Sequence, residues 1–437
     1  MENARRTLLA WLCLFAIALA GCNTGKGVTD TSITHSRVRT VNLIAGASGP
    51  LDVTVDNNTL ISGLAFEGLG QYQEVDAGTR SFQATVEGSS ASTLNTTVAL
   101  TGATDYTLVM FGSVASAGSV IVSDKIIDPG AGNFGMRLIN GAPGASVDIY
   151  VTPPGANLDT TTPSISGVAY GSASGVANLP AGTVEIRVTP ANSKQIIYDS
   201  ATQNFGERAT IDAVIYTRGS GNLVNLALLN ISDAGASSIA NSSLAQFKVI
   251  NGSAVPSPLN VFVNGELVLS NIPYPAASSY QKTSAGTPTL TVEATATPGA
   301  ALLALTPTLG AASDTSIVLT GTAGALDALV LSDNNLPPSS TRARVRVVNS
   351  SANLDAVDVY VNFSKQLTAL GRNAAAPAIE LDADATAGTP YEFDFNLSGT
   401  TQAALKLPGV TLLGGATYSI YLVGPSTALA AIVTEDR

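Results

Sequence analysis

The side chains of this chain most able to do chemistry are carboxylates that return at a fixed place in each of four repeats. One set lies in an alternating apolar run, and a second set closes each repeat. The first set is Asp52, Asp148, Asn260 and Asp358, and the second is Asp124, Asp233, Asp333 and Asp436. If the two sets met at sheet ends, they could bind Ca²⁺, with Asp52, Asp148 and Asp358 as the calcium candidates. Calcium takes six or more oxygens, however, and no D-x-D-x-D loop concentrates them. We therefore favour surface ion pairs or loop amide caps and assign no metal site.

The histidine content restricts the kinds of catalysis that are open to the chain. His35 is the only histidine and precedes the first repeat, so a Ser-His-Asp triad or a His-rich zinc site inside a repeat is excluded. Residues 130–135 match G-x-G-x-x-G but lead into a predicted strand, whereas a dinucleotide-binding loop opens a helix. Glycan hydrolysis by paired carboxylates is the enzymatic alternative. Its candidate loop insertion, Pro153 to Val168, holds one acid, Asp159, so we predict no catalytic residue, no cofactor and no enzyme activity.

The N-terminus resembles that of a bacterial lipoprotein. Arg5 and Arg6 precede a short apolar run that ends in Leu19-Ala20-Gly21-Cys22. This arrangement is typical of a secretion signal and is similar to a lipobox. The resemblance implies cleavage before Cys22, lipidation of Cys22, and attachment to a membrane through that lipid. Asn23 follows in place of Asp, which by the same resemblance favours the outer membrane of the cell envelope. The lipoprotein signal peptide is then 1–21, and 22–36 is a flexible lipidated tether.

Composition argues against nucleic acid as a partner and excludes one kind of stabilisation. The formal net charge is −11, and no basic run is present, so nucleic acid is a poor partner. The second cysteine, Cys13, lies in the signal peptide, so the mature chain cannot form an internal disulfide. Stability must therefore come from burial of apolar side chains.

A period of about 100 residues organises the rest of the chain. A Gly-Thr pair opens an alternating strand at Gly78, Gly182, Gly286 and Gly388. This period suits a self-contained β-sandwich with its own core. We predict an all-β chain of four tandem immunoglobulin-like β-sandwiches, each with seven or eight strands. Their predicted ranges are 37–128, 134–235, 243–335 and 342–437.

Strict alternation of apolar and polar residues supports the prediction of strands. In the last repeat, Tyr391, Phe393 and Phe395 alternate with polar residues, as one buried sheet face requires. Runs such as Tyr106 to Phe111 are continuously apolar and suit central strands covered by the facing sheet. The linkers are short, and the last contains Pro337-Pro338, a stiff and extended pair. We therefore expect a rod of separate sandwiches.

The first two strands of the repeats resemble the bacterial envelope domain called domain of unknown function 4397. The last repeat reads Val345-Arg346-Val347-Val348-Asn349 and then Val357-Asp358-Val359-Tyr360-Val361. The residues that match the family motif are Arg39, Asn42, Arg137, Asn140, Asn251, Arg346 and Asn349. The third repeat departs from the motif, with Lys248 for the base and Asn260 for the acid. The resemblance implies a secreted, β-rich, tandem module and no activity. The first-strand base, flanked by apolar residues, should point outward.

Together these features favour a lipid-anchored envelope protein that acts as a non-enzymatic spacer and as a binding or adhesive module for an unidentified protein or glycan. The alternatives are an envelope glycan hydrolase and a calcium-dependent binding protein.

Overall fold

The computed structural model describes residues 34–125, 127–144, 146–218, 223–231, 237–322 and 324–436. Within these ranges the chain is all-β and has no α-helix, and its only helical turn is the 3-10 helix η1 (Leu158–Thr160). The predicted signal peptide, Cys22 and Asp233 lie outside the described residues.

The strands form four successive sandwiches, here numbered 1 to 4. Sandwich 1 contains β1 (His35–Ala45), β2 (Leu51–Val55), β3 (Asn58–Leu64), β4 (Gly68–Leu69), β5 (Gln73–Asp76), β6 (Gly78–Val86), β7 (Ser92–Leu100), β8 (Asp105–Ser113) and β9 (Ser116–Ser123). Sandwich 2 contains β10 (Asn133–Asn140), β11 (Val147–Thr152), β12 (Ile165–Val168), β13 (Ser172–Ala173), β14 (Ala177–Pro180), β15 (Gly182–Pro190), β16 (Tyr198–Phe205), β17 (Thr210–Thr217), β18 (Val224–Asn230) and β19 (Ser237–Ala240).

The second half of the chain repeats the same pattern. Sandwich 3 contains β20 (Leu244–Asn251), β21 (Leu259–Val263), β22 (Glu266–Ile272), β23 (Ala276–Ala277), β24 (Gln281–Ser284), β25 (Leu290–Ala294), β26 (Ala301–Leu305), β27 (Asp314–Thr322) and β28 (Ala325–Asp333). Sandwich 4 contains β29 (Arg342–Asn349), β30 (Ala356–Val361), β31 (Ser364–Gly371), β32 (Ala374–Ala375), β33 (Ile379–Asp382), β34 (Thr389–Leu397), β35 (Ala403–Leu412), β36 (Thr417–Val423) and β37 (Ala430–Glu435).

Each sandwich packs a four-stranded antiparallel sheet against a larger sheet that has a parallel pair at its centre. In sandwich 1 the small sheet has the order β3-β2-β6-β7, and the larger sheet has the order β4-β1-β8-β9, with β5 also pairing β1. The first strand runs parallel to β8, and sandwiches 2, 3 and 4 repeat this pairing. The predicted tandem sandwich fold is thus confirmed. Among the described residues the strands number nine or ten per sandwich, more than predicted, because two short strands such as β4 and β5 pair with the first strand one after the other.

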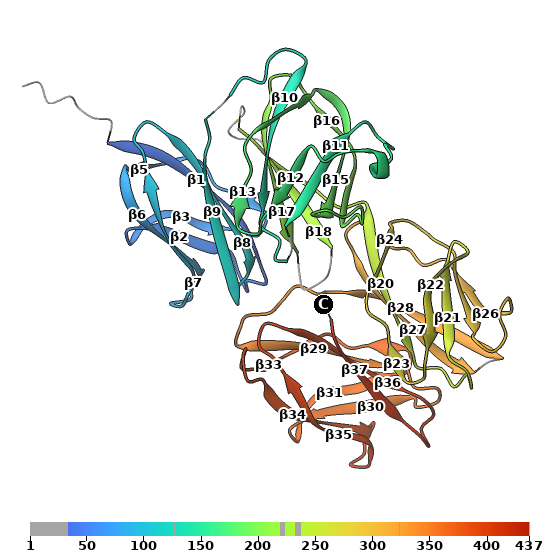
Figure 1. The fold of residues 1–437 in the computed structure, drawn as a ribbon. Coiled ribbons are helices and arrows are strands. Elements are labelled where there is room, and N and C mark those ends of the chain that lie inside the picture. The colour runs from blue at the N-terminus through green and yellow to red at the C-terminus, as the bar shows by residue number, and fades with distance from the viewer. Residues whose placement is uncertain are drawn as a thin grey trace, which may run out of the picture.

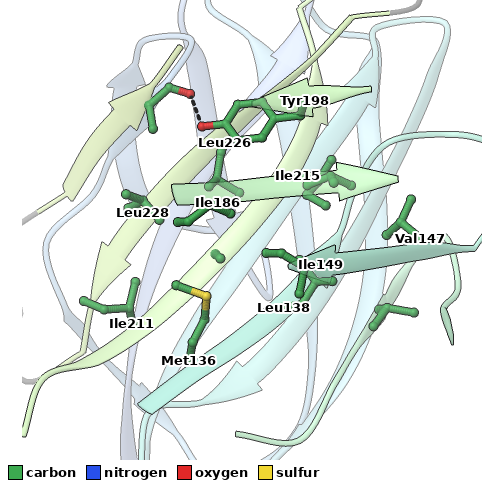
Figure 2. Close-up of a cluster of buried hydrophobic side chains, with 14 of the residues drawn as sticks. Met136, Leu138, Val147, Ile149, Ile186, Tyr198, Ile211, Ile215, Leu226 and Leu228 are labelled. Carbon is green, nitrogen blue, oxygen red and sulfur yellow. Dashed lines mark hydrogen bonds between the residues drawn. The ribbon is translucent and has the colours of Figure 1, made fainter. Parts of the chain in front are cut away.

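The inner faces of the two sheets form a separate core in each sandwich. In sandwich 2, Met136 and Leu138 from the larger sheet meet Ile149 and Ile186 from the smaller one (Figure 2). Tyr198 closes this core and satisfies its hydroxyl by donating to the carbonyl of Ala240 at 2.9 Å. The alternating apolar residues of these strands therefore face the core, as predicted.

The outer face of each larger sheet is covered by the neighbouring sandwich. Val41, Phe111 and Tyr216 belong to one apolar cluster shared by sandwiches 1 and 2. Val348 and Tyr421 belong to a second cluster shared by sandwiches 3 and 4. This explains why β8 and β36 are buried on both faces, and the facing sheet supplies only one of the two covers.

The expectation of a rod is therefore wrong. Figure 1 shows the four sandwiches gathered together, with sandwiches 1 and 2 adjacent and sandwich 4 below them. The linker between sandwiches 3 and 4 touches sandwich 1, because a Cβ atom added at Gly46 would lie 1.8 Å from the carbonyl oxygen of Pro337. Pro337 and Pro338 are buried, so this linker is a packed part of the fold and not a free spacer.

Candidate functional site

A buried asparagine lies at the end of the first strand in sandwiches 2, 3 and 4, and three residues before it in sandwich 1, and joins the two sheets. Its Nδ2 atom donates to a carbonyl at the end of the hairpin in the smaller sheet, at 3.0 to 3.2 Å. Its Oδ1 atom accepts from the amide two residues further along the chain. The asparagines are Asn42, Asn140, Asn251 and Asn349, and the carbonyls belong to Leu64, Val168, Ile272 and Leu370. Because buried backbone groups need partners, these family-motif residues have a structural role.

The Asp or Asn side chain of each second strand caps a bulge in the adjacent strand. Each Oδ1 atom accepts from a backbone N–H at 2.8 to 3.0 Å, and each donor residue has a positive φ. The acceptors are Asp52, Asp148, Asn260 and Asp358, and the donors are Gly63, Gly167, Asn271 and Ala369. A bulge leaves its extra residue outside the ladder, so its N–H requires such an acceptor. Asp358 also accepts from Lys365 Nζ at 2.8 Å, and that bond and the amide bonds hold the pKa of Asp358 below its ordinary value.

The structure does not bring these carboxylates together with the aspartates that close the repeats. Asp52 and Asp358 lie in the smaller sheets, whereas Asp124 and Asp436 follow the last strands of the larger sheets. In the described ranges, no group of three or more His, Cys, Asp or Glu side chains could hold a metal ion. His35 contacts Asp76 at 2.8 Å at the edge of sandwich 1.

The basic residue of each first strand points away from its own core but is not solvent-exposed. Arg39 is 0% exposed and Lys248 is 2% exposed. These side chains point outward from their own sandwich, as predicted. The expectation that they would lie on the protein surface is wrong. The reason is that the outer face of the larger sheet packs against a second sandwich, so a residue on that face is removed from water.

In sandwiches 3 and 4 the basic residues make reciprocal ion pairs across the boundary. Lys248 of sandwich 3 bonds to Asp436 of sandwich 4. Arg346 of sandwich 4 donates to Asp333 of sandwich 3 at 2.6 Å and to the carbonyl of Ser332 at 3.1 Å. Burial lowers the pKa of Arg346, but Asp333, Tyr421 and Asp436 together outweigh it, and the pKa lies above its ordinary value. Each sandwich therefore supplies the closing carboxylate for the first strand of the other.

Sandwiches 1 and 2 form a related network. Arg137 of sandwich 2 donates to the carbonyl of Ser123 at 3.1 Å and lies 3.8 Å from Asp124, both in sandwich 1. It also forms a bidentate pair with Asp212 of its own sandwich, at 2.8 and 2.6 Å. Burial raises the pKa of Asp212, and Arg137 partly offsets that rise. Arg39 donates to the Thr107 hydroxyl at 2.8 Å, and its Nε atom lies 3.6 Å from Asp124, so the buried guanidinium has partners inside the protein.

Two tyrosines complete the networks, and the sequence reasoning missed both. Tyr72 donates to Asp124 at 2.5 Å, and Tyr280 donates to Asp333 at 2.6 Å. Burial is the main cause that raises the pKa of Tyr280 above its ordinary value, followed by the nearby Asp333. Each tyrosine precedes its aspartate by about half a repeat, and an alignment of repeats 1 and 3 would have exposed that shared spacing.

A cleft of about 1120 Å³ lies at the edge of sandwich 1, beside Tyr72 and Arg37. In sandwich 3 the chain itself occupies the neighbourhood of the matching tyrosine. The side-chain amide of Asn335 donates there to Tyr280 at 3.0 Å and to Asp314 at 2.6 Å. The recurrent polar residues therefore form hydrogen bonds and ion pairs inside the protein. Through these bonds they connect the two sheets of a sandwich and connect neighbouring sandwiches.

Comparisons with known proteins identify the family. No curated protein matches the chain. A solved structure titled "The Bacillus anthracis TIE protein" is 10% identical, covers 90% of this chain and 68% of that chain, and has a TM-score of 0.16, which is too low to support an argument. The family described as "Domain of unknown function (DUF4397)" matches three times, at residues 36–150, 135–256 and 245–360. Each match covers most of one sandwich and runs into the next, where it reaches the second strand in the first and third matches and the first strand in the second match. The chain therefore belongs to the DUF4397 family.

Proposed function

We propose that this protein is a lipid-anchored envelope scaffold, without enzyme activity, whose packed sandwiches hold a binding surface at a distance from the membrane. The proposal is supported mainly by the structural roles of the recurrent polar residues. The asparagines join sheets, the second-strand carboxylates cap bulges, and the bases pair sandwiches. A scaffold needs these roles, because they fix the shape of each sandwich and the angle between neighbours.

The N-terminal sequence supports the proposed anchor. Leu19-Ala20-Gly21-Cys22 resembles a lipobox, and acylation of Cys22 would attach the mature chain to the outer membrane. Among the described residues, no helix is long and apolar enough to cross a membrane.

Fractionation of cells that express Cys22→Ser tests the anchor. We expect the variant to be uncleaved or soluble, whereas the natural chain sediments with the outer membrane. Cys13→Ser is the matched control, because Cys13 lies within the predicted signal and should be dispensable for attachment. A cleaved Cys22→Ser product that still sediments with membrane would disprove the proposal. Asn23→Asp should redirect the protein to the inner membrane if the sorting part is correct.

A further inference from the structure

Lys248 departs from the first-strand motif in a way that changes its chemistry. The matching positions of the other three sandwiches hold Arg39, Arg137 and Arg346. A guanidinium stays protonated in proteins, whereas an ammonium can lose its proton and become a nucleophile. The contact of Lys248 with Asp436 brings this amine against a carboxyl group of another sandwich. An amine and a carboxyl group held in contact can condense to an amide.

The contact between these two side chains is closed to water. The side chains of Lys248 and Asp436 are 3% and 2% exposed. The Nζ atom of Lys248 lies 5.0 Å from the ring centre of Tyr280 and 5.8 Å from that of Tyr421. Hydrolysis of an amide consumes water, so a site that excludes water preserves an amide once it has formed.

The other contacts between a lysine and a carboxylate in the described ranges are open to solvent. Lys365 beside Asp358 and Lys406 beside Asp394 have side chains that are 40% and 57% exposed. Water competes with such contacts and hydrates both charges, so we expect these two to remain ion pairs. Among the residues that the structure describes, Lys248 is therefore the lysine that is buried against a carboxyl group.

Two hydroxyl groups are placed to assist a condensation. Thr434 accepts a hydrogen bond from Lys248 Nζ at 3.2 Å and donates one to Asp436 Oδ1 at 2.7 Å, so its hydroxyl bridges the amine and that oxygen. Ser419 donates to Asp436 Oδ2 at 2.6 Å. The Thr434 hydroxyl can therefore pass a proton from the nitrogen to Oδ1. The Ser419 hydroxyl can stabilise negative charge that develops on Oδ2.

We propose that Lys248 and Asp436 form an amide bond that joins sandwiches 3 and 4 covalently. The ammonium first gives one proton to Oδ1, which leaves a neutral amine and a neutral carboxylic acid. The electron pair of the amine then attacks Cγ of Asp436, so that the Nζ–Cγ bond forms and Oδ2 becomes negatively charged. A second proton passes from the nitrogen through Thr434 to Oδ1. The Cγ–Oδ1 bond breaks, one water leaves, and the step consumes no oxidant, reductant or co-reactant.

Docking of the two sandwiches supplies what this condensation lacks in water. Well-oriented intramolecular reactions have effective molarities on the order of 10⁵ M or more, and here the fold holds the amine against the carboxyl group. The two residues are 188 positions apart, in strand β20 and directly after strand β37. The bond would make permanent the angle that the ion pairs set between sandwiches 3 and 4. It depends neither on the lipid anchor nor on a binding surface.

Mass spectrometry of the full chain tests the amide. Condensation removes one water, about 18 Da, and we expect purified protein kept at neutral pH for several days to lose that mass. A protease digest should then contain a branched peptide that joins Lys248 to Asp436. Lys248→Arg is the matched control, because arginine keeps the charge found in the other sandwiches, and it should keep its full mass. Thr434→Val should slow the loss by about tenfold or more. Lys406→Arg should lose the water at the natural rate.

Three outcomes would overturn the proposal. They are an unchanged mass of the natural chain, an equal loss of water in Lys248→Arg, and a branched peptide that contains a different lysine. An equal loss in Lys248→Arg would place the dehydration elsewhere, as in a succinimide. The digest of the natural chain decides the question even if a variant fails to fold. Protein that has not lost water retains the ion pair, and comparisons of stability at Lys248 and Asp436 apply to that form.

Discussion

At the scale of single residues, the recurrent polar positions have local physical causes that the sequence indicates only in part. Asp is a poor strand former, so its return in the second strands predicts a hydrogen-bonding role, and the structure shows the bulge amide that it caps. The sequence alone does not reveal the bulge, because the bulge depends on how two strands pair. The asparagine of the first strand was recognisable as a motif, but its carbonyl partner lies about 20 residues away in the other sheet.

Asn349→Ala should destabilise sandwich 4 by about 2–4 kcal/mol. The change leaves the buried carbonyls of Leu354 and Leu370 and the amide of Ser351 without their side-chain partner. Urea unfolding of the full chain, followed through the transition of sandwich 4, measures the effect. Gln402→Ala, at an exposed amide of the same sandwich, should cost less than about 0.5 kcal/mol. Equal costs at the two positions would mean that Asn349 does not join the sheets.

Asp314 should make the stability of sandwich 3 depend on pH in a direction unusual for an aspartate. Burial raises its pKa from 3.8 to about 6, although the amides of Gln246 and Asn335 partly oppose the rise. The folded state therefore binds a proton between pH 6 and 4 that the unfolded state does not bind. Stability rises as pH falls through that window and is lost as pH rises through the folded pKa.

The difference between the natural chain and Asp314→Asn isolates this effect. On lowering the pH from 7 to 3.5, the unfolding free energy of the natural chain should increase relative to that of the variant by about 3 kcal/mol. This figure is the difference of about two units between the folded and unfolded pKa values, at about 1.36 kcal/mol per unit. Urea unfolding at both pH values provides the measurement. A difference that is constant with pH, or that changes in the opposite direction, would show that Asp314 is ionised normally in the folded protein.

At the scale of strands, the alternation of apolar and polar residues predicted which side chains face the core of a sandwich. It did not predict what covers the opposite face of the larger sheet. Phe393 and Phe395 are fully buried in the core of sandwich 4, as their period of two indicates. The continuous apolar run of β8 carried a further signal. A strand in a sandwich has only one face in its own core, so a run that is apolar on both faces requires a second cover. The facing sheet could not provide it, and the neighbouring sandwich does.

Phe393→Ala should cost about 3–5 kcal/mol, because it removes a ring from a closed core. The same change at Glu392, the adjacent residue on the opposite face, should cost less than about 0.5 kcal/mol, since its contact with Lys406 is a partly exposed one at 3.7 Å. Urea unfolding compares the two variants. Similar losses would mean that the two faces of β34 are assigned wrongly.

At the scale of the whole molecule, each sandwich has its own core but shares the outer face of its larger sheet with a neighbour, so we expect stability to depend on a pair of sandwiches. An isolated sandwich 4 would expose Val348, Tyr421 and Val423 together with the Arg346 guanidinium. The sequence could not show this arrangement, because a base on an outward face has the same pattern whether it meets water or another domain. The reciprocal partners are far apart in the chain, as Lys248 and Asp436 illustrate. Residues 243–436 are therefore the smallest part of the second half that we expect to be stable and monomeric.

The ion pair between Lys248 and Asp436 provides a direct test of that pairing. Both side chains are nearly inaccessible to solvent, at 3% and 2% exposure. Asp436→Leu leaves a buried ammonium without its carboxylate and should destabilise sandwiches 3 and 4 together by about 3–5 kcal/mol. Adding Lys248→Met to that variant removes the stranded charge, so the double variant should recover to within about 1 kcal/mol of the natural chain. Asp382→Ala breaks the exposed pair with Arg342, 3.1 Å apart, and should cost less than about 0.5 kcal/mol. Urea unfolding of the full chain gives the values for these three variants and for Lys248→Met alone, which completes the cycle. If the two single changes simply added in the double variant, Lys248 and Asp436 would be independent in solution, and the sandwiches would not be docked as the structure shows.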